Sequence, residues 1–277
     1  MPARKRSSAV KETNILRRRL AAGETVHMGA FGQFLSPQFA ELMAAQGDIG
    51  CIWLDVEHGI IGPREMYLTT LAVRGRDVSV FARVAPTDYR AIMLPLEAGL
   101  EGIMAAMVTS AAQAREIVAW AKFREPDGGH FPGGRRGYNP GGPDGFFGTQ
   151  GGADYARARN AATYVIIQIE TREALAEVEA IAAIEGVDGV FFGPGDFSQA
   201  AGHLGDFMHR DCLKAMDRIA AAVDKAGKWW SSLGGTPRLY RAVKERNCRL
   251  ICVGGENSII RTGLAQMCAF GERMGGR

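Results

Sequence analysis

Trp53-Leu54-Asp55-Val56-Glu57-His58-Gly59 begins as an apolar strand and ends in two carboxylates and an imidazole. An apolar run of this kind suits a strand that is buried on both faces of a parallel sheet. Asp55, Glu57 and His58 mark the point at which the strand leaves the core. In a barrel enzyme, that point lies at the catalytic mouth.

Two later stretches end in the same way. Val165-Ile166-Ile167-Gln168-Ile169-Glu170 runs from β-branched residues into a carboxylate, and Gly189-Val190-Phe191-Phe192-Gly193-Pro194-Gly195-Asp196 does so too. A helix-like segment follows each of them. Acidic groups at several successive strand ends are what a metal-dependent barrel enzyme needs.

Apolar runs of strand length recur along the whole chain and alternate with segments of helical spacing. This alternation is typical of a parallel sheet with helical crossovers. Eight such runs favour closure into a (β/α)8 TIM barrel, an α/β fold, although alternation alone also fits an open doubly wound sheet. The predicted strands are His27–Phe31, Cys51–Glu57, Val78–Val84, Gly102–Val108, Tyr164–Glu170, Gly189–Gly193, Lys228–Leu233 and Arg249–Gly254.

Capping residues and helical spacing predict the crossover helices. The predicted starts and spans are Ser36-Pro37, Gly62-Pro63, Ser110 to Phe123, Thr171 to Ile184, Asp206 to Ala226 and Thr236 to Arg246. With 277 residues the chain is long enough for one barrel, which takes about 250. We therefore expect residues 25–277 to form a single barrel domain.

Residues 1–24 are interpreted as a basic, solvated arm that leads into a short helix at Ile15–Ala22. The arm has no apolar core of signal-peptide length, so secretion is not expected. Much of the formal net charge of +3 lies in this arm, and no nucleic-acid partner is predicted. No apolar run reaches the length of about 20 residues that spans a bilayer, so no membrane role is expected.

The chain has five cysteines, an odd number, and most of them lie within apolar segments. This favours a reduced, cytoplasmic protein over a disulfide framework or a zinc site.

The segment between Glu125 and Gly152 breaks the alternation with many glycines and several prolines. A loop of this length is usually a lid, a binding loop or a mobile segment. Because it comes after the fourth strand, we expect it on the catalytic face of the barrel, where Arg135 or Arg136 would meet an anionic substrate. A subunit contact or a mobile surface loop is an equal alternative.

Glu170 and Asp196 form the best candidate metal pair, because hard divalent cations prefer oxygen ligands and often use only one or two carboxylates. Each residue also has a structural interpretation. Glu170 could cap the helix that begins near Thr171, and Asp196 could cap the helix that follows it. Capping explains less well why Gln168 lies two residues before Glu170 on the same face of the strand.

Asp55 and His58 are the candidate proton-transfer pair, in which the carboxylate would fix the tautomer of the imidazole and raise its basicity. Glu57 shares the face of Asp55 if the strand continues. Arg83 ends the third strand and would point a fixed cation at the same mouth, where it suits a carboxylate or a developing enolate oxygen. The alternatives are a structural histidine and a buried ion pair of Arg83 with Asp55 or Glu57.

Together these stretches resemble the class II pyruvate aldolases of the HpcH/HpaI family, within the phosphoenolpyruvate/pyruvate barrel superfamily. The resemblance extends from Val26 to Gly263, nearly the whole predicted barrel. Besides residues 53–59, it rests on Ala82-Arg83-Val84, Gly99-Leu100-Glu101-Gly102-Ile103-Met104, Gln168-Ile169-Glu170-Thr171-Arg172-Glu173-Ala174 and Gly186-Val187-Asp188-Gly189-Val190-Phe191-Phe192-Gly193-Pro194-Gly195-Asp196-Phe197-Ser198.

The resemblance implies a metal-dependent aldolase that reversibly cleaves a 4-hydroxy-2-oxo acid, through a metal-stabilised enolate, into pyruvate or a close 2-oxo acid analogue and an aldehyde. It implies that Glu170 and Asp196 hold Mg²⁺, Mn²⁺ or Co²⁺. His58, positioned by Asp55, would move the proton.

For the substrate, the resemblance implies that Arg83 stabilises the enolate oxygen and that Gln168 orients the 2-oxo acid. Backbone N–H groups near Gly195 and Asp196 would receive the substrate carboxylate. Glu57 is expected beside this set.

The resemblance also implies a hexamer, built as a dimer of trimers, in which C-terminal helices are exchanged between neighbours, so Ile259 to Phe270 would pack on another subunit. Glu97 stands where the family often has an aspartate that reaches across a subunit boundary. Two other functions stay open at this stage. One is a related lyase that acts on an acyl-CoA ester or decarboxylates oxaloacetate, and the other is a noncatalytic barrel that serves as a scaffold.

Overall fold

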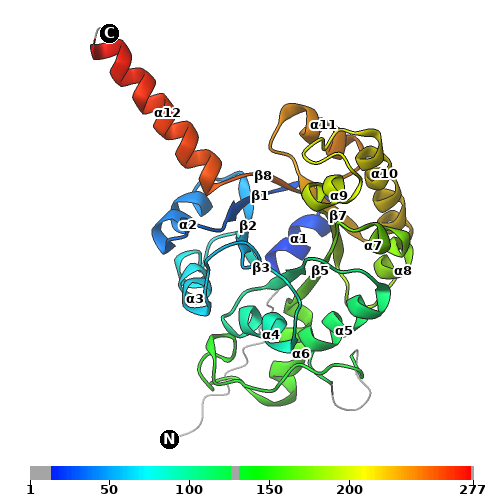
Figure 1. Cartoon of the computed structure of the whole chain (residues 1–277). Coiled ribbons are helices and arrows are strands. Elements are labelled where there is room, and N and C mark those ends of the chain that lie inside the picture. Colours follow the sequence, from blue (N-terminus) through cyan, green and yellow to red (C-terminus); the bar gives the residue numbers. More distant parts are fainter. Residues whose placement is uncertain (1–13, 126–130, 276–277) are drawn as a thin grey trace, which may run out of the picture.

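The computed structural model describes residues 14–125 and 131–275, and this part of the chain closes a barrel of eight parallel strands (Figure 1). Each strand pairs with its neighbours in sequence, and β8 pairs with β1. The strands are β1 (Val26–Phe31), β2 (Ile49–Asp55), β3 (Ser79–Val84), β4 (Gly102–Ala105), β5 (Tyr164–Ile169), β6 (Gly189–Phe192), β7 (Trp229–Leu233) and β8 (Leu250–Gly255).

All eight predicted strands are confirmed, and so is the TIM barrel, although some ends differ. β2 ends at Asp55 rather than at Glu57, and β4 ends at Ala105 rather than at Val108. Met107 explains the early end of β4, because a residue with left-handed backbone (φ 52°) cannot continue a strand.

Helices surround the barrel (Figure 1). They are α1 (Ile15–Ala21), α2 (Pro37–Ala44), α3 (Pro63–Ala72), α4 (Tyr89–Glu97), α5 (Ala111–Ala121), the short 3-10 turn η2 (Pro143–Gly145), α6 (Gly152–Ala162), α7 (Arg172–Ala176), α8 (Val178–Ala182), α9 (Pro194–Ala200), α10 (Arg210–Lys225), α11 (Pro237–Glu245) and α12 (Glu256–Gly275). The caps predicted at Ser36, Gly62 and Thr171 are confirmed, and Ser110 and Thr236 cap the helices predicted to start there.

Two crossover helices were not predicted. α4 carries Pro95 in its interior, which sequence reasoning takes as a helix breaker, although Asp88 caps the helix by accepting from the Ala91 N–H (3.0 Å). α6 begins at Gly152, at the end of the glycine-rich segment, and its N-cap Gly151 has no capping side chain that would mark the start in the sequence.

Two layers of apolar side chains build the core. One fills the barrel interior and includes Met28, Trp53, Phe81, Tyr164 and Phe191. The other lies between the strands and the surrounding helices. Leu16 of α1 is fully buried in the interior cluster, so α1 closes the N-terminal end of the barrel and leaves the carboxyl ends of the strands as the open mouth.

The glycine-rich segment does not lie at this mouth, so that expectation was wrong. α5 separates it from β4, and a helix that follows a barrel strand brings the chain back to the N-terminal end. There Lys122 Nζ donates to the carbonyl of Thr163, next to the start of β5 (2.6 Å). Arg135 pairs with Glu116 of α5 (3.0 Å). Residues 126–130 of the segment and 1–13 of the predicted arm lie outside the described residues.

Arg136 pairs with Asp144 at 2.7 Å, and both side chains are fully buried. The two arginines proposed for an anionic substrate therefore stabilise the fold at the far end of the barrel.

α12 departs from this packing, because it projects away from the barrel along most of its length (Figure 1). It contacts β1 and β8 at its base. None of the described helices is long and apolar enough to cross a membrane.

Candidate functional site

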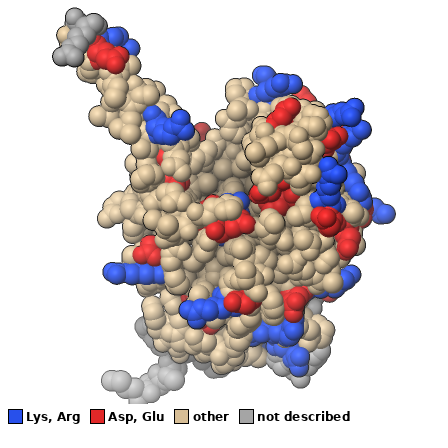
Figure 2. Space-filling view, viewed as in Figure 1, with Lys and Arg blue, Asp and Glu red and all other residues tan. Residues whose placement is uncertain are grey.

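A cavity of about 760 Å³ opens at the carboxyl ends of β1, β2, β7 and β8. Asp55 and His58 line it, together with the first residues of α12. Figure 2 shows acidic side chains around the hollow in the middle of this face. The mouth therefore contains residues predicted from the end of β2.

Arg83 is held at this mouth by a bidentate ion pair. Its Nε and Nη2 donate to the two carboxylate oxygens of Asp55 at 3.0 and 2.6 Å. β2 and β3 pair in register so that Asp55 lies opposite Arg83. The guanidinium carbon also lies 4.8 Å from the centre of the Trp53 ring, a cation–π contact. The ion pair does not prevent Arg83 from binding a ligand, because the planar guanidinium has further N–H donors.

His58 is placed differently from the expectation. Asp55 Oδ1 accepts from the backbone N–H groups of Glu57 and His58, both at 3.2 Å, and not from the imidazole. The ring Nε2 of His58 lies 3.7 Å from Glu57 Oε2 instead. The carboxylate of Asp55 is already occupied by Arg83 and these N–H groups. In this structure Asp55 therefore fixes the loop, and Glu57 is the acid beside the imidazole.

Glu57 Oε2 also lies 3.2 Å from Arg83 Nε, while the imidazole of His58 is largely exposed with 64% of its side-chain surface accessible. Burial raises the pKa of Glu57, while the positive charge of Arg83 works in the opposite direction. Oε2 has no hydrogen bond of good geometry within the described residues. A partly desolvated carboxylate between a guanidinium and an imidazole is suited to exchange a proton.

Glu170 follows β5 and is buried at the mouth. Its Oε1 accepts from the backbone N–H of Met107 at 2.6 Å, and its Oε2 accepts from Gln168 Nε2. Burial raises the pKa of Glu170, and the nearby negative charges of Glu57 and Asp196 raise it further. Glu170 is not a cap of α7, because that role belongs to Thr171, which accepts from the Ala174 N–H.

Asp196 lies in the first turn of α9, after the cap residue Gly193. A side chain at Gly193 would meet Glu170 Oε2 at 2.8 Å and Gln168 Nε2 at 3.0 Å, so only glycine lets β6 pass this close to β5. The first bond of the helix runs from the Phe197 N–H to the Gly193 carbonyl. The N–H groups of Gly195 and Asp196 precede it and therefore have no partner within the helix.

These residues fit a divalent cation. The negative charge of Asp196 helps to raise the pKa of both Glu57 and Glu170, and Glu57 adds to the effect on Glu170, so a bound cation would relieve a concentration of negative charge here. Within the described residues, the buried Oε1 of Gln168 has no hydrogen-bond partner. Glu170 and Asp196 are the residues that would hold the ion, with Gln168 facing the same space.

Glu97 lies apart from this set. It ends α4, which runs back toward the N-terminal end of its own barrel, and it faces the segment that contains Asn139 and Asp144. Burial raises its pKa, and the negative charge of Asp144 adds to the effect. Its expected role across a subunit boundary stays a prediction.

Glu256 is a site residue that the sequence reasoning missed. It is only 3% exposed, and its Oε1 accepts from the N–H groups of Gly32 and Gln33 at 2.6 and 2.8 Å. Gln33 in turn donates to the His58 carbonyl at 3.0 Å, so Glu256 holds the loop that supports His58. The signal was present, because Glu256 follows the apolar eighth strand just as Asp55 and Glu170 end theirs.

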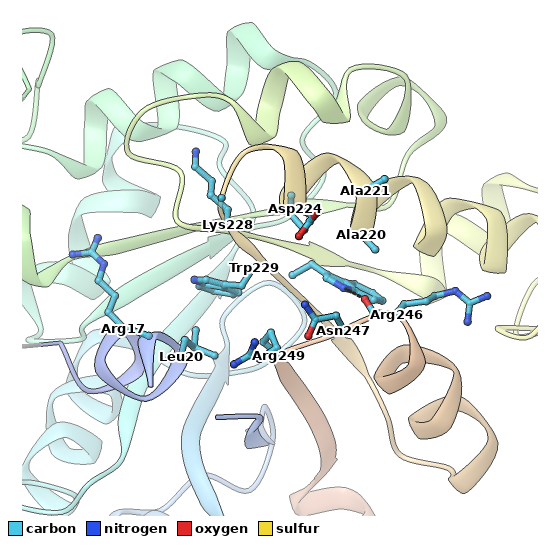
Figure 3. A pocket seen from close by; sticks show the side chains of 14 residues that line it. Arg17, Leu20, Ala220, Ala221, Asp224, Lys228, Trp229, Arg246, Asn247 and Arg249 are labelled. Atoms are coloured by element: carbon cyan, nitrogen blue, oxygen red, sulfur yellow. Dashed lines mark hydrogen bonds between the residues drawn. The ribbon is translucent and has the colours of Figure 1, made fainter. Parts of the chain in front are cut away.

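A second cavity, of about 540 Å³, lies at the opposite end of the barrel, beside α1 and the start of β7 (Figure 3). Several cations line it, but Arg17 pairs with Asp188 and Arg246 pairs with Asp217, both at 2.6 Å. It contains none of the predicted site residues. The chemistry therefore belongs to the mouth.

A family model described as HpcH/HpaI aldolase/citrate lyase matches residues 34–243. A 2-dehydro-3,6-dideoxy-6-sulfogluconate aldolase from Pseudomonas putida is 33% identical over 83% of this chain and 87% of that protein. A hydroxypyruvate/pyruvate aldolase from Sagittula stellata is 32% identical over 88% of this chain and 92% of that protein.

Among solved structures, an HpcH/HpaI aldolase/citrate lyase family protein from Burkholderia cenocepacia superposes with a TM-score of 0.85 at 29% identity. The superposition covers 93% of this chain and 98% of the other.

Proposed function

The chain belongs to the HpcH/HpaI aldolase/citrate lyase family, and on that premise we propose that it is a class II, metal-dependent aldolase. It reversibly cleaves a 4-hydroxy-2-oxo acid into pyruvate, or a close 2-oxo acid analogue, and an aldehyde. One observation carries the proposal. Glu170 lies close to Gln168 and Asp196 at the mouth of the barrel, where Arg83 supplies a cation.

Glu170 and Asp196 would hold a divalent cation, Mg²⁺, Mn²⁺ or Co²⁺, and such a cation would withdraw electrons from the keto group of the 2-oxo acid and so acidify the adjacent carbon. Gln168 offers its unpaired Oε1 to orient the ligand. The substrate carboxylate binds to the N–H groups of Gly195 and Asp196, which lack helical partners.

Arg83 binds the oxygen on which negative charge develops. Because Asp55 and the Trp53 ring fix the guanidinium before the substrate arrives, little reorganisation accompanies the reaction. Arginine suits this role because its cation does not deprotonate, even when it is partly buried.

His58 moves the proton that is exchanged when the carbon–carbon bond breaks or forms. Its imidazole reaches the cavity from an exposed position, with Glu57 beside the ring and Asp55 and Gln33 holding its backbone. The proton comes from the C4 hydroxyl of the substrate as the bond between C3 and C4 breaks and that oxygen becomes the aldehyde carbonyl, and in the reverse direction it returns there.

The aldehyde end of the substrate extends toward β7 and β8. There the cavity is lined by apolar side chains, among them Leu233 and Phe207, and by Arg238 of α11. The Arg238 guanidinium forms no hydrogen bond or ion pair within the described residues. It suits an acceptor with an anionic tail, and the name of the Pseudomonas putida relative specifies a sulfonated sugar acid.

The acyl-CoA alternative receives less support. The sequence offered Arg135-Arg136 for the phosphates of CoA, and both residues are engaged in ion pairs away from the mouth. In a noncatalytic scaffold, burial of Glu170 and Gln168 would only cost stability, because the buried Oε1 of Gln168 has no hydrogen-bond partner within the described residues.

We further propose that the chain assembles as a hexamer, a dimer of trimers, through α12. Ile259, Leu264, Met267, Phe270 and Met274 of this projecting helix are all exposed, by 48–70%. Figure 2 shows the helix mostly uncharged between its ends. An isolated helix with this apolar surface is stable only when another chain covers it. A cytoplasmic location also stays a prediction.

The cleavage activity is tested with a panel of 4-hydroxy-2-oxo acids, in which pyruvate release is measured with and without added Mn²⁺. We expect release only with metal, and its loss in Asp196→Asn. An Asp206→Asn variant, which changes an acid of the same cavity that the proposal does not use, should keep the activity. Metal-independent release would overturn the proposal.

A further inference from the structure

A cluster of His203, His209 and Asp211 lies outside the residues that the aldolase proposal uses. Their ligand atoms all fall within 4.8 Å of one another. The loop between α9 and α10 supplies His203 near its start and His209 at its end, and Asp211 belongs to the first turn of α10. The cluster thus joins the two ends of one loop.

The distances within the cluster suit a metal ion better than hydrogen bonds. His203 Nε2 lies 3.5 Å and His209 Nδ1 lies 3.6 Å from the same oxygen, Asp211 Oδ2. These separations are too long for good hydrogen bonds. They are close to the spacing of about 3.4 Å between two ligands that each bind zinc at about 2.1 Å in a tetrahedral site.

The two rings stack with their centres 3.4 Å apart, and because imidazole lone pairs lie in the ring planes, the two rings turn apart when both bind one ion. All three side chains are partly exposed, so water can complete the coordination. His209 Nδ1 also accepts the capping bond from the Asp211 N–H, but at 3.3 Å this bond is long and a metal bond would replace it at little cost.

We infer that His203, His209 and Asp211 form a second metal site, selective for a borderline transition metal such as Zn²⁺ and separate from the carboxylate site at Glu170. Two imidazoles and one carboxylate are ligands that zinc prefers, whereas Mg²⁺ prefers an all-oxygen set.

A metal ion at this site would restrain the loop between His203 and His209, which forms part of the wall of the cavity. Gly205, Asp206, Phe207 and Met208 lie between the two histidines and line the cavity at the carboxyl ends of the strands. A metal bond across the ends of this loop shortens the free segment to these few residues. The site therefore restricts the loop against which the acceptor half of a substrate would pack.

The test uses tag-free Glu170→Gln protein, in which the carboxylate site is disabled, so that success or failure is independent of the aldolase proposal. We expect one Zn²⁺ per chain by calorimetry and elemental analysis. Cu²⁺ bound in its place should show coupling to two nitrogen nuclei in its electron paramagnetic resonance spectrum.

Adding His203→Gln should weaken Zn²⁺ binding at least tenfold and remove one coupled nitrogen. His203 is partly exposed, so the variant should fold, which thermal unfolding verifies. Adding His27→Gln instead, which removes a histidine bonded to Tyr240 on another part of the barrel, should leave the affinity unchanged.

Zn²⁺ should also slow amide hydrogen exchange in residues 204–208 when His203 is present. Absence of bound Zn²⁺ in the Glu170→Gln protein, or equal affinity with and without His203, would overturn the inference.

Discussion

The backbone N–H of Met107 donates to Glu170 Oε1 at 2.6 Å, and Met107 makes this bond from a left-handed conformation with φ 52°. The side chain of a non-glycine residue is strained in this region, at a cost of about 1–2 kcal/mol. The strained backbone aims an N–H at one oxygen of a buried carboxylate whose other oxygen accepts from Gln168. Backbone conformation at the end of β4 and the orientation of a proposed metal ligand are therefore coupled.

Met107→Val should weaken metal binding about tenfold and lower the stability, because a β-branched residue tolerates the left-handed region poorly. Phe147→Val is the matched control, since Phe147 is also left-handed (φ 56°) but lies in the glycine-rich segment. It should cost similar stability and leave metal affinity unchanged. Calorimetric titration with Mn²⁺ and thermal unfolding measure the two effects. An equal loss of metal affinity in both variants would contradict the coupling.

The apolar face of α12 predicts that assembly depends on Met267, which is 70% exposed in the single chain. Met267→Glu places a charge where another subunit is proposed to pack, and we expect the assembly to dissociate in sedimentation velocity. Gln266→Glu adds the same charge to the neighbouring exposed residue and serves as the control. A wild-type protein that sediments as a monomer would remove the proposed assembly.

Glu101 predicts a pH dependence of stability that is unrelated to catalysis. Burial raises its pKa to about 7, although Ser79 donates a hydrogen bond to it at 2.5 Å. Between its ordinary pKa and pH 7 the folded chain keeps a proton that the unfolded chain has lost, so this group lowers the stability as pH rises through that window.

Glu101→Gln should remove this loss, which amounts to up to about 3 kcal/mol for a shift of this size. Urea unfolding at pH 5 and pH 8 measures it. Parallel pH profiles for the wild type and the variant would show that Glu101 ionises normally.

Arg238 should select acceptors by charge. Arg238→Ala is expected to lower kcat/KM about tenfold for aldehydes with an anionic tail and to leave neutral aldehydes nearly unaffected, because only the former gain from the cation. Arg241→Ala removes an arginine from the same helix that does not line the cavity. Equal losses for both acceptor classes would assign Arg238 to the fold instead.

Sequence reasoning could predict the barrel because each strand carries its own signal. The runs at β2, β5 and β6 are largely apolar and lead into an acid, and that pattern depends on local sequence alone. The side of the barrel on which a segment lies was harder to predict. The glycine-rich segment was assigned to the mouth because it comes after β4. That assignment overlooked α5, which lies between them and carries the chain back to the N-terminal end of the barrel.

Side-chain partners at the site depend on three-dimensional packing, so they were only partly predictable. Proximity in sequence suggested that Asp55 holds the His58 ring. The register of β2 and β3 instead places Asp55 opposite Arg83, which donates to its carboxylate. Glu256 follows the apolar eighth strand, but its partners, the N–H groups of Gly32 and Gln33, lie far away in sequence, so its role in the site was missed.

The central claim is that Glu170 and Asp196 hold a metal that acidifies a 2-oxo acid. It is tested most directly by incubating EDTA-treated protein with pyruvate in D₂O, with and without Mn²⁺ or Mg²⁺, while the methyl proton signal is followed. Glu170→Gln is the test variant, and Glu173→Gln, on an exposed position of α7, is its control. The account predicts exchange that requires metal, persists in Glu173→Gln and disappears in Glu170→Gln. Exchange that continues without metal, or that survives the loss of Glu170, would contradict it.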